Sequence, residues 1–208
     1  MGVRKLRVIA DETFVFQNLK QRVKGVARSL FRAQGRANLA SEWRRRLGGA
    51  PQLPPGRLSR VLFLCQGNIC RSPFAALLLK QHMNTLEVCS RGLRAGRGTS
   101  SPVLAQEWAQ HFAVDLSAHR SAPLCADDVA WADLILAMEG WHADLLRRDW
   151  PEALHKLRLL GDFLVAPPFT LEDPWGRDTV VFGQVFTRTA RAVECLAAQL
   201  REREQGEE

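Results

Sequence analysis

The stretch VLFLCQGNICRSP, residues 61–73, decides the fold predicted for this chain. Its apolar first half is typical of a buried β-strand, Gly67-Asn68 favours a turn, and Ser72-Pro73 favours the start of a helix over 72–83. Further apolar runs alternate with helical stretches. The apolar runs lie at 86–90, 132–138 and 156–160, and the helical stretches lie at 101–112, 140–149 and 179–201. This alternation predicts an α/β fold with a parallel sheet covered by helices on both faces.

The turn after the first strand carries residues that point to chemistry. Backbone N–H groups in a tight loop before a helix form a cradle for an anion, and the same positive field stabilises a thiolate at Cys65. Arg71 can hold two phosphate oxygens in a bidentate fork, while Gly67 and Asn68 let the backbone turn close to the anion. Ser72 can donate a hydrogen bond to the thiolate. A thiolate beside a phosphate cradle is a nucleophile for phosphoryl transfer through a cysteinyl-phosphate.

The sequence CQGNICRSP resembles the phosphate loop of the low-molecular-weight protein tyrosine phosphatases, whose pattern is C-x-G-N-I-C-R-S-P. Other stretches resemble the family in the same order: Ser90 and Gly92 after the second strand, VDLSAHRS at 114–121, ADLILAME at 132–139, LRLLGDF at 157–163 and EDPWG at 172–176. The resemblance covers residues 59–200. It implies a four-stranded parallel sheet flanked by helices, a three-layer Rossmann-like arrangement, with no cofactor and no metal.

The resemblance also implies roles for individual residues. Cys65 would be the nucleophile, Arg71 would bind the phosphate and the transition state, and Asp173 would be the general acid and then the general base. Ser90 and His119 would support Asn68 through hydrogen bonds. Contacts to phosphate or substrate would come from Gln66, Gly67, Asn68, Ile69, Cys70, Ser72 and Trp175. In addition, Cys65 and Cys70 would form the reversible disulfide with which the family shields its nucleophile from overoxidation.

Hydrolysis of phosphotyrosine in proteins is therefore the predicted function, with three alternatives. Relatives selective for phosphoarginine carry Thr where this chain has Ile69, and Ile favours a flat apolar phenyl ring. Arsenate reductases on this fold need two further cysteines near the end of the third strand, where LILAMEGWHADLL at 134–146 contains none. A non-catalytic phosphate-loop module would belong to a different class, and the presence of both Cys65 and Asp173 argues against it.

The sequence departs from the family at several positions. Residues 91–100 (RGLRAGRGTS) contain three Arg and no aromatic side chain, where the family often has one wall of the phenol slot. We therefore expect a more open, more basic entrance, with either an acidic phosphotyrosine segment or a molecule other than a protein as substrate. Gln66 replaces an apolar residue, and Glu139 stands where Asp is usual. The chain contains no Tyr, which excludes regulation by phosphorylation of loop tyrosines.

The net charge of +7 is divided unevenly along the chain. Residues 1–60 carry 11 excess positive charges, whereas residues 61–208 carry 4 excess negative charges. A Gly- and Pro-rich stretch at 48–58 predicts a linker between the two parts. The predicted organisation is a basic amphipathic helical extension at 1–47, the linker at 48–58, a catalytic domain at 59–201 and a charged tail at 202–208.

The extension has an apolar face at helical spacing, formed by Phe16, Leu19, Val23, Val26 and Leu30. It has three candidate partners: the acidic body of the same chain, an anionic membrane surface, or another acidic partner, with nucleic acid the least favoured.

Substrate partners are expected to be phosphotyrosine proteins, a tyrosine kinase among them. Five cysteines without a Cys-x-x-Cys pair favour a reducing compartment. The sequence lacks the apolar runs of a signal or membrane span, so the expected location is the cytoplasm, at or near the membrane.

Overall fold

The computed structural model describes residues 33–206, so the apolar face at 16–30 lies outside the described residues. Its centre is a four-stranded sheet with the strand order β2-β1-β3-β4. All neighbouring strands are parallel, which confirms the predicted sheet. The strands are β1 (Arg60–Cys65), β2 (Glu87–Gly92), β3 (Leu134–Ala137) and β4 (Leu157–Leu159).

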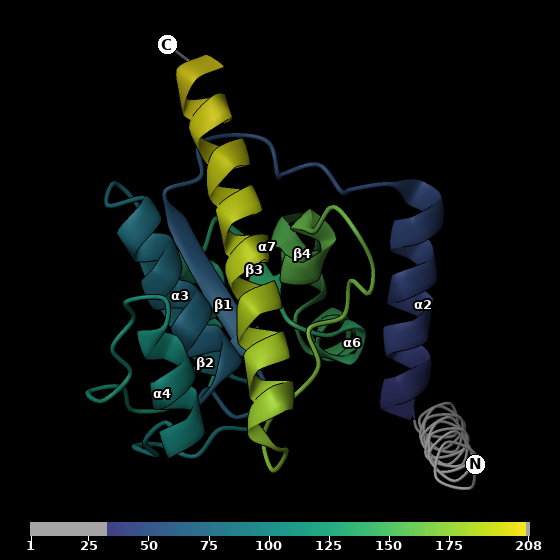
Figure 1. The fold of residues 1–208 in the computed structure, drawn as a ribbon. Coiled ribbons are helices and arrows are strands. Elements are labelled where there is room, and N and C mark those ends of the chain that lie inside the picture. Colours follow the sequence, from purple (N-terminus) through teal and green to yellow (C-terminus); the bar gives the residue numbers. More distant parts are fainter. Residues whose placement is uncertain (1–32, 207–208) are drawn as a thin grey trace, which may run out of the picture.

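Helices cover both faces of the sheet because the central strands are continuous apolar runs. Alternate residues of β1 point to opposite faces, so Phe63 joins one apolar cluster and Leu64 the other. The first cluster includes residues of α3 (Arg71–His82), α4 (Val103–Gln110) and α7 (Thr179–Gly206), which lie together on one side of the sheet in Figure 1. The second includes residues of α5 (Ala126–Trp131), α6 (Gly140–Asp149) and the 3₁₀ helix η1 (Pro151–Lys156).

Element boundaries differ from the predictions in a few places. The short helix α5 and the 3₁₀ helices η1 and η2 (Leu160–Phe163) were not predicted, because four to six residues are too few to show a helical period. The last helix continues from the predicted end at 201 through Gly206. Much of the predicted charged tail is therefore helical, because its Arg and Glu residues favour helix as strongly as the apolar residues before them.

Helix α2 (Ala33–Gly48) stands beside α6 at the edge of the molecule (Figure 1). A Cβ atom at Gly140 would lie 2.5 Å from the carbonyl oxygen of Ala37 and 2.6 Å from Oγ of Ser41. The absence of a side chain at Gly140 is thus what allows α2 to approach the start of α6. The segment preceding the catalytic body is in direct contact with that body over this helix.

Candidate active site

The residues of the candidate site meet where the parallel strands end. Cys65 is the last residue of β1 and pairs in register with Gly92, the last residue of β2. Glu139 follows β3 by two positions and precedes α6. The carboxyl edge of a parallel sheet is where ligands of such folds bind, and the crossover connections bring all three residues to this one edge.

The side chain of Cys65 is held inside the loop that connects β1 to α3. Its sulfur accepts a hydrogen bond from the backbone N–H of Asn68 at 3.2 Å and lies 3.0 Å from Oγ of Ser72. Ser72 Oγ itself accepts from Nδ2 of Asn68 at 3.0 Å, and its hydroxyl proton can be donated either to the sulfur at 3.0 Å or to the Arg91 carbonyl at 3.5 Å. The contacts with Asn68 and Ser72 hold the sulfur at a fixed position inside the loop.

Asn68 holds the loop in shape. Its backbone φ of 53° lies in the left-handed region, which Asn tolerates better than most residues. Its buried side chain donates to Oγ of Ser72 and of Ser90 and accepts from the backbone N–H of Ala122 at 2.9 Å. His119 lies 2.7 Å from the Asn68 carbonyl oxygen through Nε2. Because a carbonyl only accepts, Nε2 of His119 carries the proton.

Arg71 is the most enclosed charged group of the site, with a side chain that is 1% exposed. Its NH1 donates to Oε1 of Glu139 at 2.6 Å and to the carbonyl of Leu171 at 2.9 Å, and its NH2 lies 2.8 Å from Oδ2 of Asp173. Burial opposes the charge of Arg71, but Glu139 and Asp173 outweigh it and raise its pKa. Its Nε has no hydrogen-bond partner among the described residues, so this donor is available to a bound anion.

Asp173 lies in the loop between η2 and α7, and its side chain is 35% exposed. While Oδ2 meets Arg71, Oδ1 accepts from the backbone N–H of Trp175 at 3.2 Å. The Trp175 side chain is 65% exposed. The structure therefore brings Asp173 to the loop arginine, with Trp175 next to it and largely exposed.

The loop after β2 lies directly against the Cys65 loop. The backbone N–H of Leu93 donates to the Cys65 carbonyl at 3.0 Å, and that of Arg94 donates to the Gln66 carbonyl at 2.9 Å. The guanidinium carbon of Arg94 lies 5.6 Å from the ring centroid of Trp141. The exposed Arg94 thus stands at the rim of the site, as the basic composition of residues 91–100 predicts.

The family model of the low molecular weight phosphotyrosine protein phosphatases matches residues 60–206. The chain belongs to this family. A protein-arginine-phosphatase of Geobacillus stearothermophilus is 35% identical over 68% of this chain and 95% of its own length. A probable low molecular weight protein-tyrosine-phosphatase, EpsP of Ralstonia nicotianae, is 31% identical over 69% of this chain and 97% of its own.

Solved structures agree with this family assignment. The YwlE arginine phosphatase from Geobacillus stearothermophilus matches with a TM-score of 0.68 at 30% identity, over 72% of this chain and 97% of that one. The tyrosine phosphatase Wzb from Escherichia coli K30, in complex with sulphate, matches with a TM-score of 0.66 at 28% identity, over 69% and 99%. The shared fold is thus the three-layer phosphatase fold expected from the sequence.

Two of the remaining predicted residues of this phosphatase pack against its apolar core to different extents. Cys70 is buried at the N-cap of α3, and burial raises the pKa of its thiol far above the usual value. Ile69 is partly buried and packs against the main apolar cluster. Neither forms a side-chain hydrogen bond that would fix a substrate.

The structure adds residues that sequence reasoning missed. Glu139, Leu171 and Ala122 hold Arg71 and Asn68, and Asn38 of α2 donates to Glu139. Leu171 and Ala122 act through backbone atoms, which leave no signature in side-chain identity. Glu139 had a signal, because it replaces the Asp usual in the family, although the sequence alone did not connect it with Arg71.

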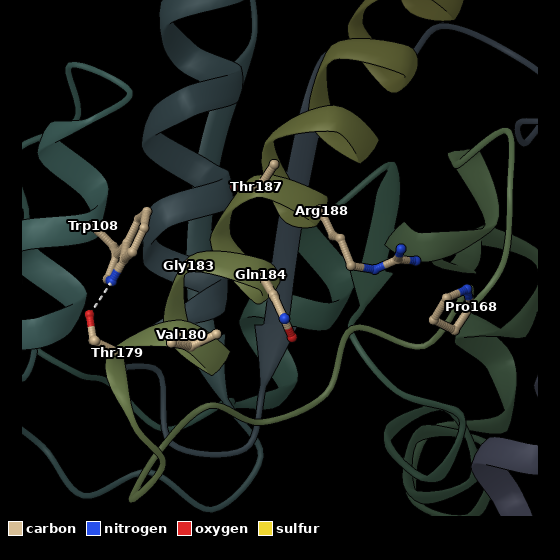
Figure 2. Close-up of a pocket in the computed structure, with 8 residues that line it drawn as sticks. All are labelled: Trp108, Pro168, Thr179, Val180, Gly183, Gln184, Thr187 and Arg188. Atoms are coloured by element: carbon tan, nitrogen blue, oxygen red, sulfur yellow. Dashed lines mark hydrogen bonds between the residues drawn. The ribbon is translucent and has the colours of Figure 1, made fainter. Parts of the chain in front are cut away.

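A separate hollow of about 700 Å³ lies between α4, the first turns of α7 and Pro168 (Figure 2). Trp108 closes one end, where its Nε1 donates to Oγ1 of Thr179 at 3.0 Å. Neither Cys65 nor Arg71 lines it. The hollow therefore borders the loop that carries Asp173 without belonging to the phosphate site.

Two further observations concern residues 33–206. No group of three His, Cys, Asp or Glu side chains in this range is arranged to hold a metal ion. No helix in it combines the length and the apolar character that a membrane crossing requires.

Proposed function

We propose that this phosphatase hydrolyses phosphotyrosine in proteins through a covalent cysteinyl-phosphate. The Cys65 thiolate attacks phosphorus while the bond from phosphorus to the phenolic oxygen breaks, and protonated Asp173 gives that oxygen its proton. Water then attacks the cysteinyl-phosphate, and the Asp173 carboxylate takes its proton as the S–P bond breaks. Inorganic phosphate leaves, and the thiolate and protonated Asp173 are regenerated.

One observation carries this proposal: Arg71 links the loop of the nucleophile to the loop of the acid. Its NH2 lies 2.8 Å from Oδ2 of Asp173, and its Nε is a buried donor with no partner among the described residues. An oxyanion bound to Nε and NH2 would displace Asp173 from Arg71. The carboxyl would then stand beside the anion, where the leaving oxygen must be protonated.

Hydrolysis of p-nitrophenyl phosphate and of a phosphotyrosine peptide tests the reaction. Cys65→Ser should abolish turnover, and Asp173→Ala should lower kcat by about 10²–10⁴-fold. The exposed residues Cys125 and Asp144 provide matched controls, since Cys125→Ser and Asp144→Ala should retain normal rates. An inactive wild-type enzyme, or full activity of Cys65→Ser, would contradict the proposal.

The choice between phosphotyrosine and phosphoarginine depends on Ile69. Phosphoarginine deserves a test because the Geobacillus relative is named a protein-arginine-phosphatase. In this chain Ile69 presents an apolar side chain next to Gly67, whose added Cβ would lie 3.5 Å from Cγ1 of Ile69. An apolar wall suits a phenyl ring better than a guanidinium, which would lose hydrogen bonds there. Wild type should prefer a phosphotyrosine peptide, and Ile69→Thr should shift the preference towards phosphoarginine.

We also propose that acidic residues flank the phosphotyrosine of its substrates. Arg94 is exposed at the rim and fixed by its backbone to Gln66, so an acidic side chain of a bound peptide would meet it. Arg94→Ala should raise KM for a phosphopeptide with Asp and Glu neighbours by about three- to tenfold, with little change for a neutral peptide. Arg147 on α6 is an exposed control. Equal effects on both peptides would contradict this specificity.

A phosphorylated tyrosine kinase is the proposed protein substrate, since such enzymes carry the phosphotyrosine that this site would accept. Asp173→Ala can serve as a substrate-trapping variant, because it retains Cys65 and Arg71 for binding but lacks the general acid. Proteins captured by this variant should be released by vanadate, which competes for the phosphate loop. Absence of a tyrosine kinase among the released proteins would remove this substrate.

We further propose that α2 lies against an anionic membrane. Its outward side exposes Leu39, Trp43 and Leu47 at four-residue spacing, each between 43% and 83% exposed, and the Arg46 guanidinium carbon lies 5.7 Å from the Trp43 ring centroid. An apolar stripe beside cations suits the headgroup region of anionic lipids. Co-sedimentation with anionic vesicles should fall for Trp43→Ala but not for Val103→Ala, an exposed residue on α4. Equal binding by both would contradict it.

A further inference from the structure

Helix α2 lies outside the part of the chain that the family model matches, which begins at residue 60. It nevertheless contacts Glu139, which is hydrogen-bonded to Arg71 of the candidate active site. Asn38 of α2 donates through Nδ2 to Oε2 of Glu139 at 2.8 Å, and its Oδ1 accepts from the backbone N–H of Trp141 at 3.3 Å. These two partners flank Gly140, against which the backbone of α2 lies. Both polar atoms of the Asn38 amide, Nδ2 and Oδ1, are therefore hydrogen-bonded.

The carboxylate of Glu139 is shared between two donors. Oε1 receives Arg71 NH1 at 2.6 Å, whereas Oε2 receives Asn38. His142 is another basic group near this carboxylate, with Nε2 at 3.8 Å from Oε1. Burial, together with Arg71 and Arg94, lowers the pKa of His142 well below its usual value, so the ring is neutral at physiological pH. Arg71 supplies the positive charge for Glu139, and Asn38 supplies the second hydrogen bond.

Glu139 in turn sets the orientation of Arg71. With NH1 occupied by Glu139 and by the Leu171 carbonyl, the guanidinium presents its other edge, Nε and NH2, to the site. A planar fork binds an oxyanion well only when both donors point at it. If Oε2 of Glu139 lost its partner, a buried carboxylate oxygen would be left unpaired, and the carboxylate would rotate towards another donor. Arg71 would then lose its fixed partner on NH1.

We propose that Asn38 is a positioning residue for phosphate binding, acting on Arg71 through Glu139. The inference deepens the proposed function and rests on it for the identity of the anion. Through Asn38, helix α2 contributes to the geometry of the phosphatase site. This contribution comes from outside residues 60–206, the range that the family model matches. The longer side chain of Glu139, in place of the family's usual Asp, is the group that reaches both Arg71 and Asn38.

The test compares Asn38→Ala with Gln34→Ala, which removes an exposed amide from the same helix. Asn38→Ala should lower kcat/KM for p-nitrophenyl phosphate about tenfold and weaken the affinity for tungstate, an oxyanion probe, by a similar factor. Gln34→Ala should change neither. Asn38→Asp, which is isosteric but places a second carboxylate against Glu139, should be more damaging than Asn38→Ala.

A double-mutant cycle separates this role from a merely structural one. In a Glu139→Ala background, Asn38→Ala should have no further effect on tungstate affinity, since the link to Arg71 is already cut. Equal loss in both backgrounds, or equal affinity of Asn38→Ala and wild type, would overturn the proposal. Circular dichroism identifies any variant that fails to fold, and Asn38→Asp then takes its place in the cycle.

Tungstate binding also keeps the two proposals distinguishable. If the wild-type protein bound tungstate but hydrolysed no aryl phosphate, the proposed reaction would fail. The role of Asn38 would still be decided by the affinities of the variants for tungstate. Conversely, normal turnover with unchanged tungstate affinity in Asn38→Ala would remove the role of Asn38 and leave the reaction standing.

Discussion

At the scale of single residues, the site depends on side chains that use nearly all of their hydrogen-bonding capacity. Asn68 is the clearest case, because its amide meets Ser72, Ser90 and the backbone of Ala122 while its own backbone meets Cys65 and His119. Together these hydrogen bonds fix the conformation of the loop more firmly than any one of them could. The loop in turn holds the charged groups of the site in position.

Asn68→Ala should therefore lower the free energy of unfolding by about 2–4 kcal/mol, because it leaves buried partners unpaired and places Ala at a φ of 53°. Ser90→Ala removes one of these hydrogen bonds and should cost about 1 kcal/mol. Urea denaturation measures both. The phosphatase rate of Asn68→Ala should fall as well, and equal stability of the two variants would show that Asn68 does not organise the loop.

At the residue scale, the sequence is informative where chemistry imposes a spacing. The positions of Cys65, Arg71 and Ser72 relative to a strand and a helix are sufficient to predict a thiol in an anion cradle. Asn38 has no such signal, since its partner Glu139 lies far away in the sequence and an Asn on a helix is ordinary. The role of Trp175 as an aromatic wall beside Asp173 stays a prediction, since this residue is 65% exposed in the structure.

At the scale of elements, the strands and long helices could be predicted because burial gives them a periodic apolar pattern. The docking of α2 could not. The buried residue of this helix is Ser41, while Leu39, Trp43 and Leu47 face outward. A helix that docks through Ser, Asn, Glu and Arg has no apolar stripe that points to its partner, so its contact surface emerges only from the folded chain.

The same helix holds the loop that carries Asp173. The carboxylate of Glu42 accepts from the backbone N–H groups of Phe169 and Thr170 at 2.8–3.1 Å. Arg45 donates to the carbonyls of Asp162 and Leu164 at 2.9 and 3.1 Å. Backbone groups of a loop thus find partners on α2 that the loop itself does not provide.

Glu42→Gln should loosen this loop, because an amide offers one accepting oxygen in place of two. Amide hydrogens of residues 168–173 should exchange faster, and kcat should fall several-fold as Asp173 becomes less well placed. Tungstate affinity should change little, since Asn38, Glu139 and Arg71 are untouched. Glu152→Gln, at an exposed position in η1, is the control. Unchanged exchange in the loop would show that Glu42 does not hold it.

At the scale of the whole molecule, α2 brings arginines of the basic part of the chain against the more acidic body. Asp162 lies where they meet. Burial raises the pKa of Asp162 to about 6, although Arg45 and Arg44 act in the opposite direction. The carboxylate form is therefore less favourable in the folded protein than in the unfolded chain.

Because the pKa of Asp162 is raised in the folded protein, the free energy of unfolding should fall as the pH rises. Near pH 4 and below, Asp162 is protonated in the folded protein, and its raised pKa costs little stability. Between about pH 4 and 6 the unfolded chain releases the proton while the folded protein keeps it, so rising pH lowers the free energy of unfolding. Asp162→Asn should remove this cost and gain about 1–3 kcal/mol over wild type above pH 6.

Thermal and urea unfolding of wild type and Asp162→Asn from pH 4 to 8 measure this effect. The difference in unfolding free energy between the two proteins should grow across the interval from pH 4 to 6 and then level off. Asp144→Asn, an exposed change on α6, controls for the loss of one negative charge. A difference that did not vary with pH would show that Asp162 titrates normally in the folded protein.

Two truncations decide where the catalytic unit begins. Helix α2 reaches Glu139 through Asn38, and it reaches the loop that carries Asp173 through Glu42 and Arg45. Deletion of residues 1–32 leaves these three side chains in place, and we expect kcat/KM for p-nitrophenyl phosphate to stay within about twofold of wild type. Deletion of residues 1–48 removes Asn38, Glu42 and Arg45 together and exposes Gly140, so kcat/KM should fall at least tenfold and the melting temperature should drop. If both truncated proteins matched the full chain, the catalytic unit would begin after α2, at the boundary that the Gly- and Pro-rich stretch predicts.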